Sequence, residues 1–402
     1  MEKIKMTAPL VELDGDEMAR VIWHLVKEKL LLPHIDLKTE YYDLHLKKRD
    51  ETDDSITTNA AYAIKKHGVG VKCATITANE DRKIEYSLKT VSASPNGTIR
   101  KILDGTVFRK PITFCTITPL IPRWKKPITI ARHSYGDVYT STSMDVEAGT
   151  RAEIVLTSKD GREKRTTIFN FEEDGIVMGE YNLDSSIRGF ARSCFMHALE
   201  EKCNLMFATK DTVVKAYDNK FKEVFEEYWD KYKKQFENAG IDYTYTLIDD
   251  AVSRIIKSEG GIIWACKNYD GDVMSDMVAT GYGSLALMTS VLVSPDGSHE
   301  YEASHGTVKQ HYYRHLKGES TSTNPIAIIF AWTGALRKRG ELDANQDLVK
   351  FCDSLEQACR DTIDSGAVTK DLFELSSSEN KKIVTTEEII DLIAKNIKLK
   401  FQ

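Results

Sequence analysis

Helical and strand-like patterns alternate along most of this chain, and that alternation is the strongest constraint on its fold. Residues 16–31 place apolar side chains on one helical face, and residues 35–44 then have the pattern of a strand. A helix over 57–67 that stops at Gly68 and a strand over 69–77 repeat the pair. The alternation continues with a helix over 184–201, a strand over 205–208 and a charged helix over 221–239. It predicts an α/β architecture on a parallel or mixed sheet.

One segment breaks this rhythm. Residues 137–181 show no helical period, and two β-rich runs at 152–157 and 165–171 flank the sequence Lys-Asp-Gly that ends at Gly161. An Asp-Gly pair between such runs is a strong hairpin signal. We expect an inserted β element whose open edges form a dimer contact, although a surface hairpin without a partner fits the same pattern.

Length and composition limit the class of protein. A chain of 402 residues is long for one core, so we expect two or three domains, and we find no flexible linker between them. The net charge of -6 argues against a nucleic-acid-binding surface. The seven cysteines are dispersed without a C-x-x-C pair, and residues 1–6 lack the apolar core of a signal peptide. The uncharged stretch 277–295 is interpreted as a helix end, a turn and a buried strand, so we expect a cytoplasmic protein with no membrane segment.

Three aspartates are candidate metal ligands. Asp249 follows a strand-like run, whereas Asp272 and Asp276 lie four apart, on one face of an expected helix. Like charges at that spacing repel each other, and a divalent cation such as Mg²⁺ or Mn²⁺ would hold them together. A solvated helix face shows the same spacing.

Arginine, tyrosine and lysine side chains could supply the rest of a site. Arg100, Arg109 and Arg132 lie on loops or strand ends, and if they converge they suit a substrate with two or three carboxylates. Taken singly, each arginine also fits the interpretation of an ordinary salt-bridge residue. Tyr139 and Lys210 could transfer protons, since a tyrosine near a lysine and a metal can have a lowered pKa.

A nucleotide site is also indicated. The sequence Gly-Tyr-Gly-Ser-Leu-Ala over 281–286 matches a dinucleotide fingerprint, but a helical pattern precedes it and a strand follows, so it is not a Rossmann loop. Residues 305–311 offer a strand end, a glycine turn and a basic helix start, which suit phosphate. The polar loop 321–325 precedes another expected helix.

Several segments together resemble the homodimeric NADP-dependent isocitrate dehydrogenases. They are residues 12–18, 70–77, 94–100, 105–109, 269–272 and 305–308, which occur in the family's order over nearly the whole chain. The resemblance implies an isopropylmalate dehydrogenase-like α/β fold rather than a classical Rossmann fold. It implies a large domain from residues 1–103 and 283–402, a small domain from 104–136 and 184–282, and a β-rich clasp for dimerisation over 137–183.

The resemblance also assigns roles to residues of this chain. Catalysis would use Tyr139 and Lys210. The metal, Mg²⁺ or Mn²⁺, would be held by Asp272 and Asp276 of one subunit and Asp249 of the other. Isocitrate would be bound by Thr77, Ser94, Asn96, Arg100, Arg109, Arg132 and Thr212, with Lys210 and Thr212 coming from the partner subunit. NADP would be contacted by Lys72, Thr75, Thr77, Arg82, Asn96, Arg254, Lys257, Gly306, Thr307, Val308, Lys309, His311 and Asn324.

The chain departs from the family pattern at a few positions. Gln310 stands where a basic residue usually contacts the 2′-phosphate of NADP, and Arg254 and Lys309 could supply the missing charge. Asp211, where an amide is typical, could alter the pKa of Lys210. Open alternatives are an NAD-preferring enzyme, a related dehydrogenase acting on homoisocitrate, isopropylmalate or tartrate, an enolase-like lyase, and an RNA-binding or scaffold protein with the same fold.

Overall fold

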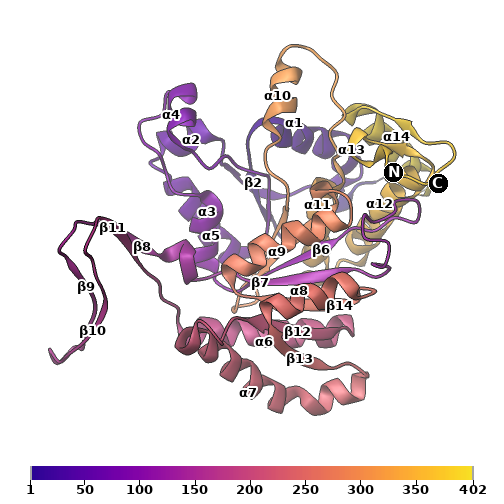
Figure 1. Cartoon of the computed structure of the whole chain (residues 1–402). Coiled ribbons are helices and arrows are strands. Elements are labelled where there is room, and N and C mark those ends of the chain that lie inside the picture. The colour runs from indigo at the N-terminus through magenta and orange to yellow at the C-terminus, as the bar shows by residue number, and fades with distance from the viewer. Residues whose placement is uncertain (1, 401–402) are drawn as a thin grey trace.

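A ten-stranded mixed sheet runs through the molecule. The computed structural model describes residues 2–400, with side chains described for 2–397. The strands lie in the order β13-β12-β14-β7-β6-β15-β16-β5-β2-β4 (Figure 1). β6 and β15 are antiparallel to both of their neighbours, and the outer strands on either side are parallel. The bounds are β2 Leu10–Asp14, β4 Thr39–Asp43, β5 Val69–Lys72, β6 Thr106–Pro111, β7 Ile128–His133, β12 Asn204–Thr209, β13 Tyr243–Leu247, β14 Ile262–Cys266, β15 Met288–Val293 and β16 His299–Ala303.

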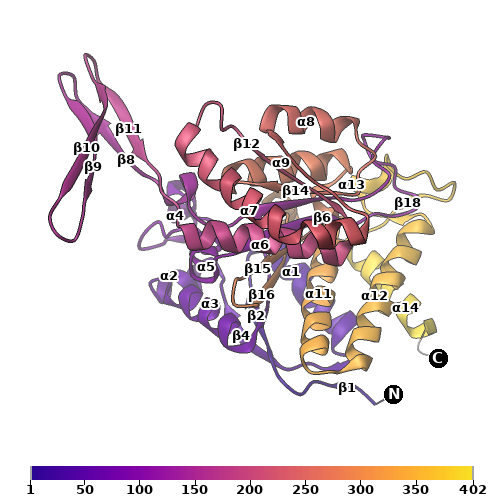
Figure 2. The ribbon, with the colours of Figure 1, turned by 90° about the horizontal axis from the view of Figure 1, so that it is seen from below.

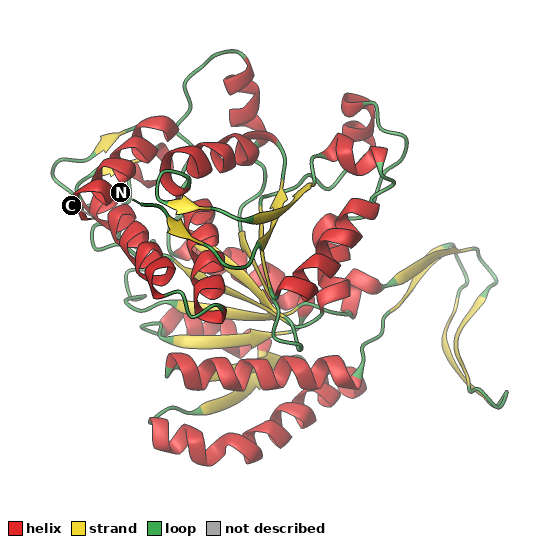
Figure 3. Ribbon diagram, turned by 180° about the vertical axis from the view of Figure 1, so that it is seen from behind, coloured by secondary structure: helices red, strands yellow, loops and turns green. Residues whose placement is uncertain are grey.

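Helices cover both faces of the sheet (Figure 3). They bury separate apolar cores. Toward the half built from the chain ends lie α1 Glu17–Val26, α3 Ser55–His67, α5 Pro95–Leu103, α11 Ile326–Leu342, α12 Gln346–Asp364 and α14 Thr386–Lys400. Against the half built from the middle of the chain lie α6 Asp184–Glu201, α7 Lys215–Ala239, α8 Ile248–Lys257 and α9 Asn268–Gly281. Short elements complete the chain: α2 Leu46–Glu51, α4 Glu80–Tyr86, α10 Lys309–Leu316, α13 Lys370–Phe373, η1 Lys27–Leu31, η2 Asp137–Thr140, η3 Leu285–Leu287, β1 Ile4–Lys5, β3 Ile35–Asp36, β17 Ala367–Val368 and β18 Lys382–Ile383.

Each half is held by its own aromatic and aliphatic packing. In the middle half, Phe207 of β12 stacks on Phe225 of α7 with ring centroids 3.7 Å apart, and Phe195 of α6 closes the same core. In the other half, Trp23 of α1 packs on Trp332 of α11 at 4.6 Å. Burying a side chain of this size contributes about 1.5–3 kcal/mol, so the two cores stabilise the two halves separately.

Strand register sorts side chains between the two faces of the central strands. Ser290 of β15 pairs in register with Arg109 of β6 on one side and with Glu302 of β16 on the other. Glu302 in turn pairs with Lys72 of β5. Opposed residues share a face, so these four side chains form a polar row across one face. Their neighbours, such as Phe108, point to the other face.

Two small antiparallel sheets of two strands each project from the body of the molecule (Figure 2). β8 Thr142–Val146 pairs with β11 Gly175–Gly179, and β9 Arg151–Thr157 pairs with β10 Glu163–Asn170. Gly161 adopts φ +80° in the turn, which confirms the hairpin expected there. Several large apolar side chains on these strands are exposed: Met144, Ile154, Leu156, Phe169, Ile176 and Met178.

The α/β prediction is confirmed, with local differences. The strand expected over 69–77 ends at Lys72, because the following residues leave the sheet and the Ile76 amide donates to the Asp16 carboxylate at 2.8 Å. The charged helix begins at Lys215 rather than 221. Residues 277–295 form the end of α9, a short turn and β15, as expected. Among the described residues, no helix is long and apolar enough to cross a membrane. All seven cysteines are free thiols.

Candidate active site

A cavity of about 610 Å³ gathers many of the predicted substrate residues. α5, which begins with Pro95 at its first turn, carries Ser94, Asn96 and Arg100 to one wall. The strands β6 and β7 supply the opposite wall. The expected residues that line the cavity are Ser94, Asn96, Arg100, Arg109, Arg132 and Tyr139, together with Asp272 of α9. Thr77 lies beside this group, and its hydroxyl is 3.2 Å from that of Ser94.

The cavity has an excess of buried positive charge. Arg109 and Arg132 are 7% and 1% exposed, and Arg100 lies next to them. Burial and the charge of Arg100 lower the pKa of Arg109, and they lower that of Arg132 to about 10. The Arg109 guanidinium donates to Ser275 at 2.6 Å, and Arg132 donates to Asn268 at 2.8 Å. Guanidinium groups held this close repel one another, so an anionic ligand with several carboxylates would stabilise them.

Asp272 is the acidic group of this cavity. Its carboxylate is ion-paired with Arg132 and lies 3.5 Å from the Arg109 guanidinium. Burial alone would raise the pKa of Asp272, but Arg132 and a hydrogen bond from Tyr139 outweigh burial and lower it. Asp276, one turn later on α9, lies 3.7 Å from Arg109, and burial and the charge of Asp272 raise its pKa. The two carboxylates therefore share one helix face, as their spacing predicts.

The Tyr139 hydroxyl donates to Asp272 at 2.6 Å, and its ring lies 4.8 Å from the Arg132 guanidinium. Burial and the bond to Asp272 raise the pKa of Tyr139 to about 12. In the single chain the pKa of Tyr139 is therefore raised, whereas the sequence analysis considered a lowered pKa for a tyrosine near a lysine and a metal.

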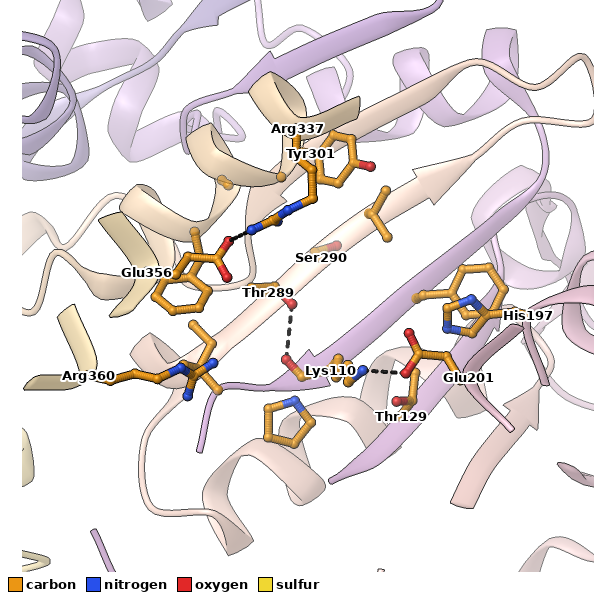
Figure 4. A pocket seen from close by; sticks show the side chains of 17 residues that line it. Lys110, Thr129, His197, Glu201, Thr289, Ser290, Tyr301, Arg337, Glu356 and Arg360 are labelled. Atoms are coloured by element: carbon orange, nitrogen blue, oxygen red, sulfur yellow. Dashed lines mark hydrogen bonds and ion pairs between the residues drawn. The ribbon is translucent and has the colours of Figure 1, made fainter. Parts of the chain in front are cut away.

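A second cavity lies on the opposite face of the sheet and differs in its charge. It is about 350 Å³ in volume and is lined by residues of β6, β15, α6, α11 and α12 (Figure 4). Two of its cations are paired within the lining: Lys110 with Glu201 at 2.6 Å, and Arg337 with Glu356 at 2.8 Å. In the first cavity three arginines line the wall together with one carboxylate, that of Asp272, so the first cavity is the better site for a polyanionic substrate.

The remaining residues predicted to act in catalysis or metal binding lie outside this cavity. Lys210 follows β12 and is ion-paired with Asp249, which stands in the first turn of α8. Thr212 lies in the adjoining turn, and Asp211 pairs with Lys222 at 3.2 Å. Within residues 2–397, no group of three or more His, Cys, Asp or Glu side chains is arranged to hold a metal. One chain therefore brings Asp272 and Asp276 together but leaves Asp249 apart.

The loop between β16 and α10 has features of a phosphate and nucleotide site. Val308 opens α10 in the left-handed conformation, with φ +58°. The Thr307 hydroxyl bonds to Glu17, whose carboxylate also pairs with Arg82 at 2.7 Å. His311 contacts Thr323 at 2.7 Å, next to Asn324. Thr75 Oγ1 and Asn96 Oδ1 are buried with no hydrogen-bond partner among the described residues. Such unpaired polar atoms fit a ligand with many hydrogen-bonding groups.

Other expected cofactor residues are more dispersed. Lys72 is 1% exposed, and its ammonium donates to Glu302 at 3.3 Å and to the Cys73 carbonyl at 3.0 Å. Arg254 and Lys257 lie on α8, where Arg254 pairs with Asp250 at 2.6 Å. Lys309 lies in the first turn of α10, 3.5 Å from Glu85. Gly306 lies in the loop just before that helix.

Sequence reasoning missed three residues at this site. Glu302 lies buried on β16 and bonds to Arg100, and Asn268 bonds to Arg132. Glu17 contacts both Arg82 and Thr307. The sequence does indicate that Glu302 shares a strand face with Glu300, since the two alternate along the strand, but it does not indicate which residue of a neighbouring element Glu302 meets.

Comparison with known proteins assigns the chain to a family. Residues 5–393 match the family described as isocitrate/isopropylmalate dehydrogenase. The chain is a member of that family. It is 52% identical to the mitochondrial isocitrate dehydrogenase [NADP] of Sus scrofa over 98% of this chain and 96% of that protein. It is 52% identical to the human mitochondrial isocitrate dehydrogenase [NADP], covering 98% of this chain and 89% of that protein. Isocitrate dehydrogenase [NADP] 1 of Mycobacterium tuberculosis is 51% identical, with 98% and 97% covered. The family's mixed α/β fold is the one described above.

Proposed function

We propose that this protein is a metal-dependent, NADP-dependent isocitrate dehydrogenase that converts isocitrate to 2-oxoglutarate and CO₂ while reducing NADP⁺ to NADPH. The observation that carries the proposal is the cavity in which Arg100, Arg109 and Arg132 converge around one aspartate. Relatives named as NADP isocitrate dehydrogenases, about 52% identical over nearly the full chain, support the same reaction.

The arginines would bind the substrate carboxylates. Isocitrate carries three carboxylates, and the planar guanidinium fork binds a carboxylate through two parallel hydrogen bonds. Ser94, Asn96 and Thr77 lie at the α5 side of the cavity, where they would hydrogen-bond the remaining oxygens. Binding would offset the mutual repulsion of the arginines and fix the hydroxyl-bearing carbon for hydride transfer.

The carboxylates of Asp272 and Asp276 fit two of the ligands of Mg²⁺ or Mn²⁺. They are oxygen donors one helical turn apart, and both side chains are partly exposed, at 40% and 61%. Asp249 of a second subunit would complete the set. A cation bound there would supply Lewis acidity, which favours ionisation of the substrate hydroxyl and stabilises negative charge after CO₂ is lost.

The residues near the β16–α10 loop fit NADP, which would accept the hydride. The polar loop ahead of α10 and the left-handed Val308 at its start support this position. The buried oxygens of Thr75 and Asn96, which have no hydrogen-bond partner among the described residues, could bond further ligand groups. Gln310 leaves the start of α10 without the usual basic group, and Lys309 beside it would supply charge to the 2′-phosphate. Arg254 and Lys257, from the partner, would add to it.

Tyr139 and Lys210 would move protons. Tyr139 lies at the rim of the cavity with its hydroxyl on Asp272, where it would protonate the carbon left by decarboxylation. Lys210 lies outside this cavity in its own chain, so we propose that it enters the site of a second subunit.

A homodimer would bring these groups together. We propose that the projecting strands 137–183 form the dimer clasp, which their exposed apolar side chains support. The separate cores support a division into two domains, and we propose a large domain of 1–103 and 283–402 and a small domain of 104–136 and 184–282. Near the boundaries the packing is shared: Ile112, Phe114 and Ile117 join a core of the chain ends, and Met288 joins a core of the middle half. We propose a cytoplasmic location, in keeping with seven unpaired thiols.

A direct assay tests the reaction. NADP⁺ reduction is followed with isocitrate and Mg²⁺, then with EDTA, and then with homoisocitrate, isopropylmalate or tartrate in place of isocitrate. We expect isocitrate turnover that EDTA abolishes. Turnover of another substrate but not of isocitrate would contradict the proposed substrate. A higher kcat/KM with NAD⁺ than with NADP⁺ would contradict the proposed cofactor.

A further inference from the structure

Glu302 joins two cations that arrive from different parts of the fold. Its carboxylate accepts from the Arg100 guanidinium at 3.0 Å through Oε1 and from the Lys72 ammonium at 3.3 Å through Oε2. Arg100 belongs to α5, whereas Lys72 belongs to β5, the strand beside β16. The Glu302 side chain is 8% exposed, so both bonds are largely shielded from water.

The bond to Glu302 engages Arg100 on one side only. A guanidinium carries five N–H donors, and Glu302 engages Nη2. Among the described side chains, Glu302 is the carboxylate within ion-pair distance of Arg100. Since Arg100 lines the substrate cavity, its other donors are free to face a ligand there.

Glu302 also opposes the repulsion within the arginine cluster. The charge of Arg100 acts on both Arg109 and Arg132, and neither guanidinium is exposed enough for water to screen it well. Removing the Glu302 charge would favour Arg100 rotamers that point away from its two neighbours. The carboxylate thus selects the arrangement in which all three arginines face one cavity.

Glu300 provides a contrast on the same strand. It lies two residues earlier on the same face and is 3% exposed, but one of its oxygens has no hydrogen-bond partner among the described residues. Burial and the neighbouring Glu302 raise the pKa of Glu300 to about 8, whereas Lys72 and Arg100 outweigh burial and lower that of Glu302 to about 2. The two shifts run in opposite directions, so negative charge is favoured on Glu302, the carboxylate that contacts both cations.

We propose that Glu302 is a positioning residue for substrate recognition, whose carboxylate holds the Arg100 guanidinium in the orientation that receives a substrate carboxylate. The inference rests on the proposed function, because it takes Arg100 to be a ligand of isocitrate. It predicts an effect on substrate affinity that passes through Arg100.

The first test compares Glu302→Gln with Glu300→Gln, which is its matched control on the same strand. A hydrogen bond between charged groups is worth about 1.5–3 kcal/mol, so Glu302→Gln should raise the KM for isocitrate about 10- to 100-fold, with a smaller change in kcat. Glu300→Gln alters a side chain that has no hydrogen bond or ion pair with Arg100 among the described residues, and it should leave that KM unchanged. Glu302→Asp, which keeps the charge on a shorter stem, should recover part of the affinity.

The second test is a double-mutant cycle with Arg100→Gln. If Glu302 acts through Arg100, adding Glu302→Gln to Arg100→Gln should raise KM little further. An unchanged KM in Glu302→Gln, or an equal further rise in the Arg100→Gln background, would overturn the inference. Thermal melting is recorded for each protein, and if Glu302→Gln does not fold, Glu302→Asp decides by the same comparison. Wild-type protein without isocitrate turnover would instead refute the proposed function, which separates the two failures.

Discussion

Neutralising Asp272 and neutralising Asp276 should have different effects on stability but similar effects on catalysis. Asp272→Asn leaves the Arg132 guanidinium, 1% exposed, without its anionic partner and removes the charge 3.5 Å from Arg109. Breaking a buried ion pair costs about 3–5 kcal/mol, and because Asp272 is 40% exposed we expect about 1–3 kcal/mol. For a chain of this size that corresponds to a fall in Tm of about 1–4 °C.

Asp276→Asn should behave differently in the metal-free protein. Asp276 is 61% exposed, lies 3.7 Å from its nearest cation and is repelled by Asp272. Its neutralisation should change stability by no more than about 0.5 kcal/mol. Both substitutions remove a proposed metal ligand, so both should lower kcat/KM with Mg²⁺ at least about 100-fold.

Thermal melting in EDTA and steady-state assays at saturating Mg²⁺ measure the two effects. Asp270→Asn on the same helix is the control, because Asp270 lines neither cavity. An Asp276→Asn enzyme with wild-type kcat/KM would refute the reasoning, as would equal losses of Tm in the two variants.

Four further results are expected. Because burial raises the pKa of Glu300 to about 8, the folded state holds a proton that the unfolded state has released, so stability falls as pH rises from about 5 to 8. Urea unfolding should show Glu300→Gln gaining on wild type across that window, and a constant difference would contradict this. The double substitution Ile154→Asp/Leu156→Asp should shift the protein from dimer to monomer in light scattering and abolish activity. An active monomer would contradict shared sites. Lys309→Ala should lower kcat/KM for NADP⁺ more than for NAD⁺, and equal losses for the two cofactors would show that Lys309 does not bind the 2′-phosphate. Gln310→Arg should raise the preference for NADP⁺ over NAD⁺.

Periodicity and turn residues were sufficient to predict much of the fold. The helix ending before Gly68 and the hairpin at Gly161 were predictable because each uses a glycine with positive φ. The strand expected over 69–77 was too long, since its end depends on the distant Asp16 carboxylate that takes the Ile76 amide. A contact across 60 residues leaves no local signal.

Only those features of the site that depend on local spacing were predictable from the sequence. The spacing of Asp272 and Asp276 fixes their shared helix face, but the convergence of Arg100, Arg109 and Arg132 depends on how α5, β6 and β7 pack. Glu302 escaped notice because its role depends on cross-strand register, which a single sequence does not specify.

Subunit complementation tests most directly whether two chains build each site. Asp272→Asn and Lys210→Met should each be nearly inactive as pure homodimers. After unfolding and refolding as an equal mixture, half of the dimers would be mixed, and in each of these one of the two sites would have both Asp272 and Lys210 intact. We therefore expect about one quarter of wild-type activity to return. If mixed dimers form and the activity stays at the level of the parents, sites shared between subunits are contradicted.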